Sequence, residues 1–166
     1  MSSVASITVS GMDDLQRKLS SLGADLAKEL SKSGLKAMKL NVEDKAKEKC
    51  VVDTGNLRAS INTQEVMESG KSLIKTGTTV FYAPYIEFGT GVYAENGNGR
   101  KTPWLWKVQS PKWEGILAKW IGADGTILWY GSRAHPFLRP AFDEGKEQVM
   151  DDIKADLQAA IARYQG

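Results

Sequence analysis

Cysteine and histidine are almost absent from this chain of 166 residues, which contains one of each, Cys50 and His135. A single cysteine excludes a disulfide within the chain and every zinc site built from cysteines alone. A single histidine excludes the paired-histidine motifs of metalloproteases. Because most hydrolase and metalloenzyme templates need these residues, we predict that the chain is not an enzyme and has no catalytic, cofactor or metal site.

Long apolar runs and a strong net charge are missing as well. No segment approaches the roughly 18 apolar residues of a membrane-spanning helix. The first six residues lack the basic and apolar regions of a signal peptide, so we expect a cytosolic protein with no membrane partner. With 22 basic and 20 acidic residues the net charge is only +2, and binding to nucleic acid or lipid would need a local basic patch.

Aromatic residues are missing from the first 80 positions, whereas thirteen of the fourteen lie in Phe81–Phe142. All five tryptophans fall within Trp104–Trp129. Eighty residues without an aromatic side chain would form a poor core on their own. We therefore predict one core domain made of residues 1–91 and 131–166, with residues 92–130 inserted as an aromatic hairpin.

Apolar periodicity predicts the elements of the first half. Residues 6–10 alternate and are rich in β-branched side chains, which is typical of a short strand. Leucines spaced three and four apart from Leu15 to Leu30 indicate a helix, which Gly23 interrupts and which continues to about Cys50. Two strands should follow at 59–66 and 72–81, joined by a hairpin turn at 68–71.

The second half begins with a proline-led helical turn at 83–88. Residues 104–108 and 126–130 form the predicted arms of an antiparallel ribbon, with apolar residues at helical spacing between them. Apolar residues four apart predict a closing helix over 139–164. The fold class that follows is α+β, with two long helices packed on an antiparallel sheet and an inserted Trp-rich β-hairpin.

Two patterns suggest chemistry but lack the context for it. Residues 89–94 match the dinucleotide pattern G-x-G-x-x-A by letters, yet the glycines that follow prevent the helix which that pattern must open. His135 could act as a general base of a small hydrolase, oriented by Asp143, Glu144 or Glu87. A lone histidine before a proline is more typical of a structural or interface residue.

The tryptophan cluster admits three interpretations. Its side chains could anchor a protein interface, could form a small core private to the hairpin, or could stack on nucleic acid or carbohydrate. Interleaved Lys and Arg residues make a nucleic-acid-binding module the alternative function. Alternation along a strand places Trp104 and Trp106 on one face and Leu105 and Lys107 on the other.

Arg58 lies in a turn-forming segment with local hydrogen-bonding side chains, Val52–Ile61. Its guanidinium could clamp a carboxylate such as that of Glu87 through a bidentate pair. A helix that ends and leads into a strand would account for the same segment without any such contact.

Three segments, taken in order, resemble a known family. They are Val52–Ile61 (VDTGNLRASI), Tyr82–Gly91 (YAPYIEFGTG) and Ala134–Phe142 (AHPFLRPAF). Together they are similar to the tailed-phage head–tail joining family, whose members are neck or tail-completion proteins of the lambdoid siphophage type. The similarity spans about residues 5–165. Residues 92–104 are similar to a subset of the family, whereas residues 105–130 depart from its pattern.

The resemblance implies a non-enzymatic α+β subunit that assembles into a ring of about six copies, with closed rotational symmetry. Such a ring lies in the neck or tail-top region of the virion, after assembly in the host cytoplasm. Its implied partners are copies of itself, head-closure or neck proteins on one side, and tail-tube or tail-terminator proteins on the other. Phage DNA would pass transiently through the lumen.

Interfaces in rings of this kind favour aromatic and arginine anchors. We therefore predict a partner and oligomer interface near the base of the inserted hairpin. Its candidate residues are Arg58, Phe88, Thr90, Trp104, Trp106, Trp129, Tyr130, Arg133, His135, Phe137 and Arg139.

Overall fold

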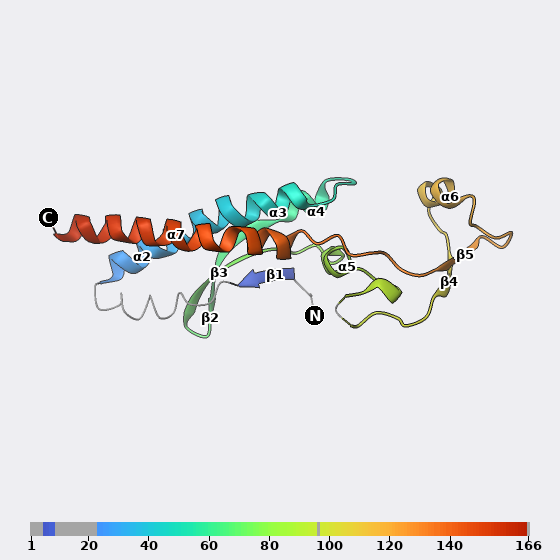
Figure 1. Ribbon diagram of the computed structural model, residues 1–166, viewed down its shortest axis with the longest axis horizontal. Coiled ribbons are helices and arrows are strands. Elements are labelled where there is room, and N and C mark those ends of the chain that lie inside the picture. The colour runs from blue at the N-terminus through green and yellow to red at the C-terminus, as the bar shows by residue number, and fades with distance from the viewer. Residues whose placement is uncertain (1–4, 9–22, 96, 166) are drawn as a thin grey trace.

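The computed structural model describes residues 5–8, 23–95 and 97–165. It has the predicted α+β architecture, in which two long helical segments pack against small antiparallel hairpins (Figure 1). The molecule is elongated: the long helices occupy one end and a two-stranded ribbon occupies the other.

The first helical segment is continuous and has three parts. Helix α2 (Ala24–Met38) passes through a π-helical turn (Lys39–Glu43) into α3 (Asp44–Lys49). Gly23 directly precedes α2 with a φ of 106°, which confirms the predicted break. The predicted helix end near Cys50 is also confirmed, whereas the leucine pattern before Gly23 lies outside the described residues.

The second helical segment is α7 (Leu138–Gln165), which confirms the predicted closing helix. It runs antiparallel to the first, because contacts that move forward along one helix move backward along the other. Ser33 Oγ donates to Asp156 Oδ2 at 2.8 Å, and Asn41 Nδ2 donates to Asp152 Oδ2 at 2.7 Å.

A three-stranded antiparallel sheet lies against this helical pair. Its strands are β1 (Ala5–Thr8), β2 (Asn62–Glu68) and β3 (Lys71–Thr78), in the order β1-β3-β2. Ser69 and Gly70 join β2 to β3, and both have positive φ (52° and 77°), as a tight hairpin turn requires. The predicted hairpin is therefore confirmed.

The predicted start of the first hairpin strand is wrong. Residues 59 and 60 belong to a short helix, α4 (Asn56–Ser60). Gly55 adopts a left-handed conformation with a φ of 83°, and its carbonyl accepts a hydrogen bond from Ala59 N at 2.9 Å. This single helical turn ends at Ser60, and β2 begins at Asn62. The strand therefore starts three residues later than predicted.

Two clusters of buried side chains form the core. The first joins the two helical segments to the sheet, and its buried members are Leu26, Leu30, Ala37, Met38, Val42, Ile74, Val149, Ile153 and Ala160. The second lies where α3, α4, α5 (Ala83–Phe88) and the start of α7 meet, and its buried members are Ala46, Cys50, Leu57, Ile61, Ala83, Phe137, Leu138 and Ala141.

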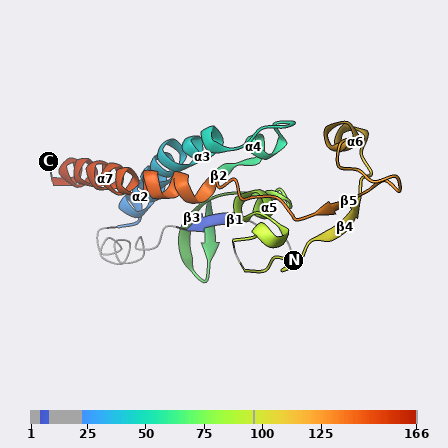
Figure 2. The same ribbon diagram turned by 45° about the vertical axis from the view of Figure 1, so that its right-hand side comes forward.

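The predicted aromatic ribbon is present. Strand β4 (Trp104–Lys107) pairs with β5 (Thr126–Trp129) antiparallel, with Trp104 opposite Trp129, and α6 (Pro111–Leu117) lies between them in the sequence. Both views place these elements beyond the first turn of α7, away from the sheet (Figures 1 and 2). The alternation in β4 is confirmed, because its two tryptophans are half-buried and Leu105 and Lys107 are exposed.

Gly145 allows α7 to approach the π-helical turn closely. A Cβ atom at this position would overlap the carbonyl oxygen of Asn41. We predict that Gly145→Ala lowers the free energy of unfolding by about 1–3 kcal/mol, because the two helices would have to separate. Urea unfolding followed by circular dichroism measures this change.

Gly115→Ala in α6 is the matched control, because a Cβ there would meet no heavy atom within 4 Å. This control should leave stability unchanged or raise it slightly, since alanine favours helix. Equal stability of G145A and G115A would contradict the close-approach interpretation.

Candidate interaction site

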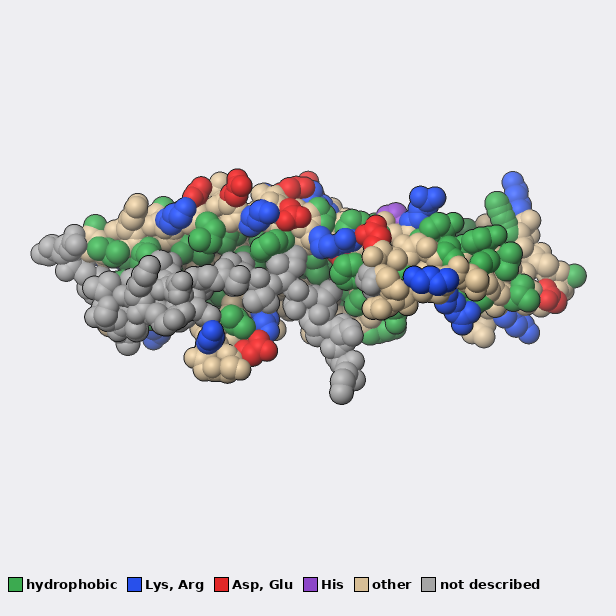
Figure 3. All heavy atoms as spheres, turned by 60° about the horizontal axis from the view of Figure 1, so that its bottom comes forward, with side chains coloured by type: hydrophobic (Ala, Val, Ile, Leu, Met, Phe, Trp, Pro, Cys, Tyr) green, Lys and Arg blue, Asp and Glu red, His purple; other side chains and the backbone are tan. Residues whose placement is uncertain are grey.

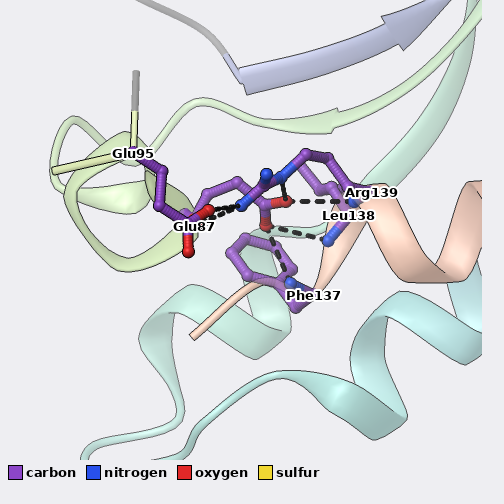
Figure 4. Close-up of polar contacts among 5 residues, drawn as sticks. All are labelled: Glu87, Glu95, Phe137, Leu138 and Arg139. Carbon is purple, nitrogen blue, oxygen red and sulfur yellow. Dashed lines mark hydrogen bonds and ion pairs between the residues drawn. The ribbon is translucent and has the colours of Figure 1, made fainter. Parts of the chain in front are cut away.

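A buried glutamate joins the second of the three sequence segments to the third. Glu87, at the end of α5, is 1% exposed. Its Oε2 accepts hydrogen bonds from Phe137 N at 2.8 Å and Leu138 N at 3.0 Å, and its Oε1 accepts one from Arg139 N at 3.0 Å (Figure 4). These are amide groups at the beginning of α7, which have no partner within the helix. The carboxylate therefore caps α7 and lies at the positive end of its dipole.

Arg139 completes the coordination of this carboxylate. Its Nε donates to Glu87 Oε1 at 3.0 Å, and its Nη2 donates to the Glu87 carbonyl oxygen and to Glu95 Oε2, both at 2.8 Å (Figure 4). The guanidinium also lies over the Phe88 ring, 4.7 Å from its centroid. The hydrogen bond to Glu95 in the first place, and also that to Glu87, raises the pKa of Arg139 above its ordinary value.

The second core cluster brings all three segments together beneath this cap. Leu57 and Ile61 come from the first segment, Ala83 from the second, and Phe137 and Leu138 from the third. Apolar packing and the buried carboxylate act on the same few residues. They hold α4, α5 and the start of α7 in one arrangement.

The expected partner of Glu87 is corrected by this geometry. Four donors from the third segment occupy its two carboxylate oxygens, whereas Arg58 is exposed on α4. Arg139 is the residue that clamps Glu87. Arg58 acts on another group, because its charge partly offsets the rise that burial causes in the pKa of the Cys50 thiol.

His135 has no orienting carboxylate among the three considered. Glu87 is fully occupied, Asp143 pairs with Lys146 at 3.3 Å, and Glu144 pairs with Lys49 at 2.8 Å. The imidazole is exposed, and the backbone N of His135 donates to Ile86 O at 2.8 Å. The backbone hydrogen bond of His135 thus links α5 to the segment before α7.

A short neck of two hydrogen-bonded chain segments, residues 89–92 and 130–132, connects the core to the ribbon. Thr90 N donates to Ser132 O at 2.8 Å, and Val92 N donates to Tyr130 O at 2.9 Å. Gly91 and Gly131 both have positive φ, and a Cβ on either would overlap the opposite chain. These glycines therefore allow two backbones to pack directly against each other.

Aromatic and cationic side chains extend from this neck into the ribbon. The rings of Trp106 and Trp129 pack 5.4 Å apart, as a small shared core. The Arg100 guanidinium lies over the ring of Trp104 at 4.9 Å, and that of Arg133 lies over Tyr93 at 5.1 Å. Figure 3 shows hydrophobic side chains gathered at this end of the molecule, with Lys and Arg side chains among them.

The predicted interface residues fall into three groups by exposure. Arg58, Tyr130, Arg133 and His135 are exposed, whereas Phe88, Thr90, Trp104, Trp106, Trp129 and Arg139 are half-buried. Phe137 is 0% exposed and packs in the second core cluster, so it serves the core. The neck and the adjoining ribbon bring most of the other members together, while Arg58 lies apart on α4.

Comparison with known proteins identifies the family. Residues 13–89 match the model of the HK97-gp10-like family, which describes a tail component of bacteriophage HK97. Over these residues the chain is similar to the HK97-gp10-like family. The resemblance drawn from the three segments is thus confirmed at the level of a phage tail component of the virion. Neither the curated proteins nor the solved structures give a match.

The HK97-gp10-like match covers a little under half of the chain and ends at Gly89, two residues after Glu87. The ribbon and the third segment lie beyond it. The structure links the third segment to the matched region through the Glu87 cap. Sequence reasoning named Glu87 only as a partner for Arg58 or His135, although a Pro residue at position 140 marked the helix start that Glu87 caps.

Within the described residues, no helix is both long and apolar enough to cross a bilayer. The same part of the chain holds no group of three or more His, Cys, Asp or Glu side chains placed to bind a metal ion.

Removal of the Glu87 carboxylate should destabilise this protein strongly. Glu87→Ala leaves the backbone amides of residues 137–139 and the Nε of Arg139 without their acceptor, so we predict a loss of about 3–5 kcal/mol in the free energy of unfolding. Glu87→Gln, which retains one acceptor oxygen, should lose less. Urea unfolding monitored by tryptophan fluorescence and circular dichroism measures both.

Glu68→Ala is the matched control, because Glu68 pairs with Lys75 at 2.6 Å on the exposed surface of the hairpin. Exposed pairs contribute about 0–1 kcal/mol. If E87A and E68A destabilised the protein equally, Glu87 could not be the fixing contact of the junction.

Proposed function

We propose that this chain is a structural subunit of the phage head–tail connection, which joins head-closure proteins to the tail tube as a neck or tail-completion ring. The observation that carries the proposal is the match of residues 13–89 to a family of phage tail components. We further propose a ring of about six copies, since closed rotational symmetry lets every copy use the same contacts. Copies of the chain, head-closure proteins, and tail-tube or tail-terminator proteins are its partners.

The geometry supports a role based on contacts. The core is fixed by the Glu87 cap, while the ribbon end exposes large apolar side chains. We propose that residues 92–130 act as an appended unit on a core of residues 1–91 and 131–166. The half-buried and exposed residues of the predicted interface, which lie where the core joins the ribbon, then anchor neighbouring subunits.

The strands of the ribbon give the nucleic-acid-binding alternative little support, although Trp113 and Trp120 between them are exposed. Base stacking needs open aromatic faces. Trp106 and Trp129 pack against each other, and Arg100 covers Trp104. We propose that DNA only passes through the lumen of the ring, where weak contacts suffice, and that the chain converts no substrate.

Deletion of the gene for this chain from its phage or prophage tests the proposal. We predict DNA-filled heads and separate tails, with loss of infectious titre, because the two parts lack their connector. Electron microscopy of lysates and plaque assays measure the two effects.

Complementation provides the control for the deletion. The wild-type gene and the E68A variant should both restore titre, whereas E87A should restore it poorly. Normal numbers of infectious particles in the uncomplemented deletion strain would refute a role in head–tail connection.

A further inference from the structure

The first helical segment carries a line of four lysines, which we call the lysine stripe. Its members are all exposed and lie at intervals of four, four and three residues: Lys28, Lys32, Lys36 and Lys39. At 3.6 residues per turn, these positions fall within about 80° of the helix circumference and span about 16 Å along its axis. The four ammonium groups therefore lie on one face of the helix.

No carboxylate among the described residues pairs with a member of the lysine stripe. Two acidic side chains line the same groove between α2 and α7 as two of these lysines, but each contacts another group. Glu29 pairs with Arg163 at 2.8 Å, and Asp156 accepts a hydrogen bond from Ser33 at 2.8 Å. The positive charge of the stripe is therefore not neutralised by ion pairs.

The lysine stripe does not stabilise the helix that carries it. Like charges four residues apart on a helix repel each other, and two pairs of stripe lysines have this spacing. Exposed lysines of α7 instead have acidic neighbours, since Lys146 pairs with Asp143 and Lys154 with Asp151. Because the whole chain carries a net charge of only +2, attraction of a polyanion depends on a local patch of this kind.

The composition of this face indicates which polyanion it fits. The first 80 residues contain no aromatic side chain, so the stripe offers no ring on which an unpaired base could stack. Protein interfaces favour aromatic residues and arginine and are depleted in lysine. Lysine binds phosphate as a compact point charge. Regularly spaced lysines without stacking groups thus fit the backbone of a double helix, which carries one negative charge per about 1.7 Å of its axis.

We propose that the lysine stripe binds the phosphate backbone of double-stranded DNA without regard to base sequence. This inference rests on the proposed function, in which DNA passes through the lumen of the ring, and it assigns the face of each copy that contacts the DNA. Helix α2 lies in the half of the molecule opposite the ribbon (Figure 1), so this face is separate from the predicted interface near the neck. Contacts to phosphate alone allow DNA to slide along the surface.

Fluorescence anisotropy of a short labelled DNA duplex, titrated with the full-length protein at a series of low salt concentrations, tests the proposal. The logarithm of the binding constant should fall linearly with the logarithm of the salt concentration. We expect a slope of about −3 to −4, because each neutralised phosphate contributes about −0.9. Duplexes of different sequence should bind equally well.

A double variant, Lys32→Gln with Lys36→Gln, removes the centre of the lysine stripe. It should bind the duplex at least about tenfold more weakly at low salt and make the slope shallower by about 2. The matched control, Lys146→Gln with Lys154→Gln, removes the same charge from exposed positions of α7. The control should bind like the wild type, and circular dichroism verifies that both variants keep their helices.

An equal loss of affinity in the two double variants would overturn the proposal, because net charge and not the stripe would then govern binding. A wild-type chain that binds no duplex at low salt would overturn it too. Tighter binding to polyglutamate than to DNA would replace it by an acidic protein partner.

The gene deletion tests the head–tail role independently of these assays. Separate heads and tails after the deletion, together with no DNA binding by the purified chain, would refute the lysine stripe alone. Normal particles after the deletion, together with stripe-dependent DNA binding, would refute the head–tail role alone.

Discussion

The carboxylate of Glu87 fixes the direction in which the chain enters its last helix. Four donors from residues 137–139 converge on its two oxygens, and the packing of Phe137 and Leu138 holds those donors in place. Arg139, one of these donors, also donates a hydrogen bond to Glu95 at the base of the ribbon. The core, the start of α7 and the base of the ribbon are therefore joined through one group of polar contacts centred on the buried Glu87 carboxylate.

This centre matters because the two ends of the molecule differ in character. The helical end is an ordinary apolar core, whereas the ribbon end leaves Ile116, Trp120 and Leu105 largely exposed. A fixed junction between a stable core and an apolar, partly uncovered end suits a component of a larger assembly. The similarity of residues 13–89 to a family of phage tail components agrees with that arrangement.

Sequence patterns predicted the long helices and the ribbon because periodicity is a local property. Leucine spacing and Gly23 located α2, and the alternation of Trp104–Lys107 located β4. The partner of Glu87 was not predictable in this way, because Arg58 and Arg139 are both arginines in conspicuous motifs and only the fold decides which one lies nearby. For the same reason the pattern could not separate Phe137, which is buried, from the exposed Arg133.

Electron cryomicroscopy of purified particles, with mass spectrometry of their proteins, tests the central claim most directly: that copies of this chain surround the junction of head and tail. The account predicts that the chain is present and that density for several copies encircles the axis at the top of the tail. Absence of the chain from intact particles, or its location away from the junction, would contradict the account.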